Sequence, residues 1–119
     1  MLRTTTILSL LLAPAAAALA GEADVLDAEV ECNGHCRFSV SVEHADEGWD
    51  HYANKWEVLD GDGGVIAVRE LAHPHVNEQP FTRSLGRVEI PEGLDNVTVR
   101  AHDSVHGYGG KTLTVEIPR

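Results

Sequence analysis

The chain has 119 residues, enough for one domain of ordinary size and too few for two. Its 19 acidic residues outnumber the 9 basic ones, which gives a formal net charge of −10 at pH 7. A molecule of this sign repels polyanions, so nucleic acid and anionic membranes are excluded as favoured partners. The same charge attracts cations, and it also keeps an exported protein soluble.

The first twenty residues differ from the rest in composition. Arg3 carries their only charge, an apolar run covers residues 7–12, and alanine dominates residues 13–20. A basic start, an apolar centre and small residues at the end are typical of a cleaved signal peptide. The apolar run is too short to span a bilayer, although a retained membrane anchor is the alternative interpretation.

The predicted cleavage point lies between Ala20 and Gly21, because Ala18-Leu19-Ala20 fits the rule of small residues at the cleavage site. No cysteine stands at this point, which argues against a lipid anchor of the bacterial type. We therefore expect a signal peptide at 1–20 and a domain at 21–119. The domain would be periplasmic or secreted, and it would not be an integral membrane protein after cleavage.

The only two cysteines are Cys32 and Cys36, in the segment CNGHC. In an oxidising compartment a pair this close predicts a disulfide. A redox pair and half of a metal site are the alternatives. The spacing is not the CxxC of redox motifs, and no further cysteine is present to complete a thiolate zinc site.

Apolar residues alternate with polar ones from residue 23 onward, as in Phe38, Val40 and Val42. This period of two predicts strands with one buried face. The ambiguous stretch is 44–53, which is also compatible with one helical turn. Seven short strands with glycine-rich turns between them predict an all-β fold, a seven-stranded antiparallel sandwich of the immunoglobulin or fibronectin type III kind. The expected strands cover residues 24–31, 37–43, 54–60, 65–71, 81–90, 96–102 and 111–117.

If each strand crosses the sandwich once, the second, fourth and sixth loops share one end. These loops, 44–53, 72–81 and 102–110, are longer than a turn requires, and long loops on a rigid scaffold commonly carry binding sites. His35 falls at the opposite end. The remaining histidines fall on the three long loops or next to them: His44, His51, His73, His75, His102 and His106.

The motif His73-Pro74-His75 favours a metal site, because proline keeps the residue before it extended and two imidazoles then project to one side. His102 and His106 would complete the site from a neighbouring loop. Imidazole and carboxylate ligands suit zinc, copper(II) or nickel. The additional ligands that we expect are His51, Glu78 and Asp103.

Several alternatives remain open at this stage. In one interpretation the histidines only hydrogen-bond the loops together, and in another Glu78 pairs with Arg83. Asp46 and Glu47 are interpreted as solvated or turn-forming carboxylates. The leading prediction is an exported, non-catalytic module that binds a divalent transition metal. A protein–protein interaction module with an unknown partner, using the same loops, is the second, and a metal-dependent enzyme is the third.

Three segments resemble an uncharacterised family of small periplasmic β-sandwich proteins of proteobacteria. The segments are EGWDHYANKWEVLDGDG, LAHPHVNEQPFTRSLGRVEIPEG and VTVRAHDSVHGYGGKTLTVEIP, which together cover most of the chain after residue 46. The resemblance implies export and a β-domain, and it assigns no catalytic residue.

Overall fold

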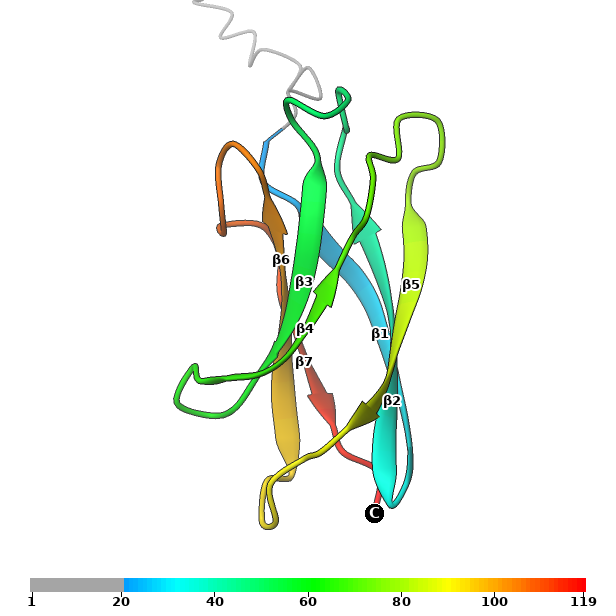
Figure 1. Cartoon of the computed structure of the whole chain (residues 1–119). Coiled ribbons are helices and arrows are strands. Elements are labelled where there is room, and N and C mark those ends of the chain that lie inside the picture. The colour runs from blue at the N-terminus through cyan, green and yellow to red at the C-terminus, as the bar shows by residue number, and fades with distance from the viewer. Residues whose placement is uncertain (1–20) are drawn as a thin grey trace, which may run out of the picture.

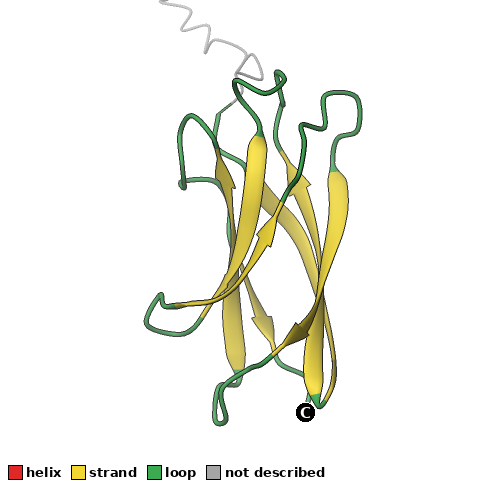
Figure 2. Ribbon diagram, viewed as in Figure 1, coloured by secondary structure: helices red, strands yellow, loops and turns green. Residues whose placement is uncertain are grey.

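The structure is a computed structural model that describes residues 21–119, so the predicted signal peptide lies outside the described residues. In this part the chain forms strands and loops without a helix (Figure 2), which confirms the predicted all-β class. Each strand lies within a few residues of its predicted range. The strands are β1 (Asp24–Asn33), β2 (His35–Glu43), β3 (Ala53–Leu59), β4 (Val65–Glu70), β5 (Phe81–Val88), β6 (Asn96–Asp103) and β7 (Leu113–Glu116).

The strands form two antiparallel sheets packed as a sandwich (Figure 1). One sheet has the order β1-β2-β5 and the other the order β4-β3-β6-β7. In a constant-type immunoglobulin domain the fourth strand belongs to the sheet of the first two. Here β4 pairs with β3 instead. The predicted seven-stranded sandwich is thus confirmed, with its fourth strand in the four-stranded sheet.

The core lies between the sheets and is built from the alternating apolar positions of the strands. Phe38, Val40 and Val42 of β2 are fully buried, as are Trp56 and Val58 of β3. All five belong to one hydrophobic cluster. Burying each such side chain contributes about 1.5–3 kcal/mol, so this cluster fixes the two sheets on which the loops are mounted.

The loops divide between the two ends of the sandwich as the alternation of strands predicts (Figure 1). The β2–β3, β4–β5 and β6–β7 connections gather at one end, which we call the histidine end. The β1–β2, β3–β4 and β5–β6 connections lie toward the other, the disulfide end. The described chain begins at the histidine end, next to the β2–β3 and β6–β7 loops.

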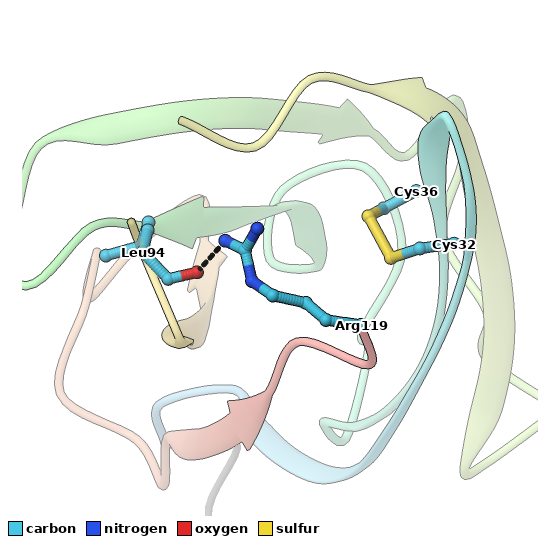
Figure 3. Close-up of a disulfide and its surroundings, with 4 residues drawn as sticks. All are labelled: Cys32, Cys36, Leu94 and Arg119. Carbon is cyan, nitrogen blue, oxygen red and sulfur yellow. Dashed lines mark hydrogen bonds between the residues drawn. A yellow bond between two sulfur atoms is a disulfide. The ribbon is translucent and has the colours of Figure 1, made fainter. Parts of the chain in front are cut away.

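At the disulfide end the predicted bond between Cys32 and Cys36 is present, with the two Cα atoms 4.0 Å apart. The bond crosses the β1–β2 hairpin, whose turn is tighter than expected because Gly34 adopts a φ of +78°. Strand β2 therefore begins two residues before its predicted start. Arg119 donates a hydrogen bond to the carbonyl of Leu94 at 2.6 Å beside the disulfide (Figure 3).

Candidate metal centre

Three buried side chains meet at the histidine end: His44, His51 and Asp103. One ligand atom from each, an imidazole nitrogen or a carboxylate oxygen, lies within 4.8 Å of the other two. We call these residues the His-His-Asp cluster. His44 directly follows β2 and Asp103 is the last residue of β6, so the cluster draws on both sheets.

A tight turn places His51 in the cluster. Gly48 accepts a hydrogen bond from the His51 amide at 3.2 Å, and Gly48 itself adopts a φ of +106°, which favours glycine. The segment therefore forms a turn rather than the helical turn that its sequence also allowed. Tyr52 and Ser104 then tie this loop to the β6–β7 loop. The Ser104 amide donates to the Tyr52 carbonyl at 2.9 Å, and the Ser104 hydroxyl accepts from the Tyr52 amide at 3.0 Å.

The carboxylate of Asp103 organises the β6–β7 loop around itself. Its Oδ2 accepts hydrogen bonds from the amides of Val105 at 3.1 Å and His106 at 2.9 Å. The imidazoles of His51 and His106 lie 2.9 Å and 3.2 Å from the same oxygen. The other oxygen, Oδ1, is buried and has no hydrogen-bond partner. A buried carboxylate oxygen without a partner is an open acceptor position, and such positions call for a bound group.

Electrostatics keep Asp103 ionised. Burial alone would raise the pKa of its carboxyl, but the amides of His106 and Val105 and the imidazoles of His51 and His106 outweigh burial and lower it below 3.8. The carboxylate is therefore an anion at any pH near neutrality. A fully buried anion among imidazoles is suited to hold a cation.

His44 is held by a second carboxylate. Its Nδ1 lies 2.6 Å from Oδ1 of Asp46. Its Nε2 lies 2.9 Å from the carbonyl oxygen of Gly21 and 3.9 Å from Oδ2 of Asp103, so an ion bound there would replace the contact with Gly21. Asp46 is itself fixed by the amides of Ala53 at 3.0 Å and His75 at 2.7 Å. Histidines that bind metals usually donate their second ring N–H to a carboxylate in this way, which sets the tautomer and aims the free nitrogen.

One residue of the cluster, His44, lies next to a hollow in the surface. A surface hollow runs beside His44 and Asp46 and is lined further by Glu43, Val76 and Gln79. Its rim includes the carboxylate of Glu43, which favours the approach of a cation. The buried cluster therefore lies next to an opening at the surface.

The structure separates the predicted ligands into groups. His51 and Asp103 lie in the cluster, and His106 lies beside it, with its ring centroid 4.9 Å from that of His51. His102 faces away to Asn54, whose side-chain oxygen lies 2.6 Å from the His102 Nδ1, and packs against the ring of Tyr108. Desolvation and Lys55 lower the pKa of His102.

His73 and His75 form a second group at the same end, with ring centroids 4.7 Å apart. The His75 ring stacks on Phe81, and its Nε2 accepts a hydrogen bond from Arg83 at 2.9 Å. Arg83 also donates to Glu78 at 3.2 Å, so Glu78 forms the ion pair that was the alternative to its predicted role as a metal ligand. Nε2 of His75 is therefore taken up by the hydrogen bond from the Arg83 guanidinium, and it belongs to the same network as the ion pair of Arg83 with Glu78.

Two contributors to the centre were missed or misread from sequence. His44 had been placed at the correct end without a role as a ligand. Of the two interpretations of Asp46, the solvated one is wrong, since only 6% of the residue is exposed and its carboxylate fixes loop amides instead. The signal was a His-x-Asp pair directly after an alternating strand, a position where the two side chains can share one face.

Comparisons with known proteins give one informative match. The chain is 43% identical over 97 residues to a protein of the archaeon Halomicrobium mukohataei named "Putative lipoprotein". The match covers 80% of this chain and 47% of that protein, so the chain spans about half the length of the relative. No family model matches, and no solved structure matches. The relative's archaeal source gives no support to the proteobacterial origin that the family resemblance implied.

Residues 21–119 contain no helix that is both long and apolar enough to pass through a bilayer.

Proposed function

We propose that the domain binds a divalent transition-metal ion through His44, His51 and Asp103. The observation that carries the proposal is the meeting of two imidazoles and a buried carboxylate within 4.8 Å of one another, on a carboxylate whose second oxygen, Oδ1, has no hydrogen-bond partner. His106 is a candidate for the fourth ligand, since its Nδ1 lies 3.2 Å from Asp103 Oδ2. The function is binding of the ion by an exported module, with no catalytic step assigned.

The distances suit a metal of this class. In a tetrahedral zinc site with bonds of about 2.0–2.1 Å, neighbouring ligand atoms stand about 3.3 Å apart. Here Oδ2 of Asp103 lies 2.9 Å from Nε2 of His51 and 3.9 Å from Nε2 of His44. These two separations bracket the required value, while the ligand atoms as a group lie within 4.8 Å of one another, so the side chains would draw together around the ion.

The types of ligand atom narrow the choice of metal ion. Two imidazoles and a carboxylate suit zinc, copper(II) or nickel, whereas calcium and magnesium prefer oxygen ligands alone. The orienting contact from Asp46 to His44, at 2.6 Å, is the feature that supports a built site over a chance group of histidines.

Export supports the same proposal. The disulfide between Cys32 and Cys36 is a feature of proteins in oxidising compartments. A relative named as a lipoprotein, together with the predicted signal peptide, is consistent with a domain that acts outside the cytoplasm, in the periplasm or secreted.

Calorimetric titration of zinc, copper(II) and nickel into residues 21–119 tests the proposal. We expect one ion per chain, and we expect His44→Gln and His51→Gln each to weaken binding at least about tenfold, which is roughly 1.4 kcal/mol. The matched control is His35→Gln at the disulfide end, which should leave affinity unchanged. Absence of binding in the unmodified domain, or equal affinity in all four proteins, would overturn the proposal.

A second function has one observation in its favour. Three apolar side chains at the histidine end are strongly exposed: Trp49 at 67%, Val76 at 55% and Val105 at 58%. Exposed apolar groups gathered at one end suit the docking of a protein partner. If this is the function, replacing all three with serine should abolish association with the partner and leave metal affinity unchanged. Association that survives the triple replacement would reject this alternative.

A further inference from the structure

We propose that a metal ion at the His-His-Asp cluster displaces residues 21–22, which we call the entry segment, from their contact with His44. The inference rests on the proposed function and adds a conformational response to it. Without the ion the entry segment is docked on the cluster, and with the ion it is released. Three observations lead to it: the hydrogen bond that the Gly21 carbonyl accepts, the buried anchor that follows, and the contact of Glu22 with the β6–β7 loop.

The Gly21 carbonyl and a metal ion require the same position at His44. The carbonyl oxygen lies 2.9 Å from Nε2 of His44. A carbonyl oxygen only accepts hydrogen bonds, so Nε2 carries a proton in this contact, whereas a bound ion needs the lone pair of that nitrogen. An ion bonded to Nε2 would lie about 2.0–2.1 Å away along the direction of the N–H bond, which leaves less than about 1 Å between the ion and the oxygen. The carbonyl must therefore move when the ion binds.

A buried anchor follows the entry segment directly. Ala23 is 1% exposed, and the carboxylate of Asp24 accepts a hydrogen bond from the Lys111 amide at 2.7 Å. Gly21, by contrast, is only partly buried, and Glu22 is exposed. Among the hydrogen bonds within residues 21–119, the contact with His44 is the only one that Gly21 makes. Breaking it leaves the anchor in place, so the movement is confined to the entry segment.

The side chain of Glu22 joins the entry segment to the β6–β7 loop. Its Cγ lies 3.0 Å from the position that a Cβ on Gly109 would occupy, so the absence of a side chain at Gly109 makes room for it. The docked segment thus contacts His44, which follows β2, and also the loop that follows Asp103. The cluster takes ligands from both of these elements. An ion bound to His44 and Asp103 would replace the link that the docked segment provides between them.

The competition between the entry segment and the ion is weak enough for the ion to bind. Exchanging one neutral hydrogen bond for contacts with water corresponds to about a two- to tenfold change in an equilibrium constant. The docked segment therefore lowers metal affinity by about this factor and does not block binding. At saturating metal the segment is released, because the ion and the carbonyl cannot both occupy Nε2 of His44. The path of the chain into the domain thus depends on whether the centre holds an ion.

The test measures where residue 22 lies with and without zinc. Nitroxide labels are attached at Glu22→Cys and Glu89→Cys in residues 21–119, which are acetylated at Gly21 so that no free amine binds the ion. Pulsed electron resonance then gives the distribution of distances between the labels. We expect a narrow distribution without zinc and, at saturating zinc, a broader one shifted by up to about 7 Å, which is the reach of two residues. The matched control pair, Asp27→Cys with Glu89→Cys, reports from beyond the anchor and should not change.

The outcomes separate the two proposals. Calorimetry on the labelled domain shows whether zinc binds. Binding with an unchanged distance distribution would overturn the displacement and leave the metal centre intact. Absence of binding would reject the metal centre as a whole.

Asp24→Ala gives an independent check, because it loosens the anchor and so weakens docking of the entry segment. We expect it to raise zinc affinity at least about twofold. The matched control is Asp27→Ala, which removes the same charge from the same strand and should not raise affinity. Loss of a negative charge by itself weakens the attraction for a cation, so a rise cannot come from the charge. Equal zinc affinities in the two variants would count against the inference.

Discussion

The two ends of the sandwich contain the same kind of residue pair in opposite environments. At the disulfide end Nε2 of His35 lies 3.6 Å from Glu89, and the two side chains are 56% and 87% exposed. At the histidine end Nε2 of His51 lies 2.9 Å from Asp103, and the exposures are 11% and 0%. An exposed pair contributes about 0–1 kcal/mol, because water solvates both partners. The charges of a buried pair must be balanced by neighbouring protein groups, because water does not reach them. Such a pair therefore restricts which groups can lie around it.

Loop length explains the difference. The disulfide end uses a short hairpin turn at Gly34, which leaves His35 in water. The histidine end uses loops long enough to fold over one another and be joined by Tyr52 and Ser104. Burial of histidine and aspartate at only one end indicates that this end was built around a polar centre, and each of the following experiments probes that asymmetry.

The largest effect should come from Asp103→Ala. It leaves the amides of Val105 and His106 and the ring of His51 without their acceptor, so we expect a loss of about 3–5 kcal/mol in the free energy of unfolding. Urea denaturation measures it. Asp103→Asn, which keeps the shape, should lose metal affinity with a smaller stability change. The matched control is Glu89→Ala, and an effect of Asp103→Ala no larger than that of the control would contradict the asymmetry.

Removing the disulfide should come next. Replacing Cys32 and Cys36 with alanine frees a five-residue loop in the unfolded chain, and the loop-entropy relation gives a loss of about 2 kcal/mol. Metal affinity should stay unchanged, because the bond lies at the opposite end from the cluster. Thermal unfolding of the double variant measures the first quantity and calorimetric titration the second. A parallel loss of metal affinity would show that the two ends are coupled.

A smaller effect should appear in the pH dependence of stability without metal. Burial, Arg83 and His73 lower the pKa of His75, against the opposing effect of Asp46 and Glu78. The unfolded chain therefore takes up a proton at higher pH than the folded chain, so the contribution of His75 is complete above about pH 6.5 and declines as the pH falls below it.

His75→Gln isolates that contribution, since glutamine also offers Arg83 an acceptor and does not titrate. We expect its melting temperature to fall less between pH 7 and pH 5 than that of the unmodified domain. His102, whose pKa is lowered in the same direction, remains in the variant and leaves part of the slope. An identical pH profile for the two proteins would reject the role of His75.

The smallest effect is expected at His35. Its partner Glu89 is almost fully exposed, so His35→Gln should change the free energy of unfolding by less than about 0.5 kcal/mol. Denaturant unfolding of the two proteins side by side would reveal any larger change. A loss above about 1 kcal/mol would mean that the exposed pair stabilises the fold by more than a solvated pair can.

Sequence alone predicted strands such as β2 because they have one buried face, and the alternation of Phe38, Val40 and Val42 records that face directly. It also predicted which loops share an end, since that follows from counting strands. It did not predict which imidazoles meet. That choice depends on the turn at Gly48 and on hydrogen bonds between loops, as from Ser104 to Tyr52, which no periodic pattern encodes.

The histidine–proline–histidine motif was predicted to place two imidazoles on one side. The ring of its second histidine instead stacks on Phe81 and accepts a hydrogen bond from Arg83. The contribution of His75 to the cluster is made by its backbone amide, which fixes Asp46. Backbone donors carry no sequence signature, so a role of this kind could be read only from coordinates. The predicted ligands outside the cluster, among them His73 and His102, remain predictions.

The cluster takes His44 from the end of β2 and Asp103 from the end of β6, strands that belong to different sheets. An ion bound there would cross-link the two sheets. The two sheets could then separate at that end only by breaking a bond to the ion. Opening of the sandwich at the histidine end would therefore be rarer with the ion bound, and hydrogen exchange of the amides there would slow when metal is added.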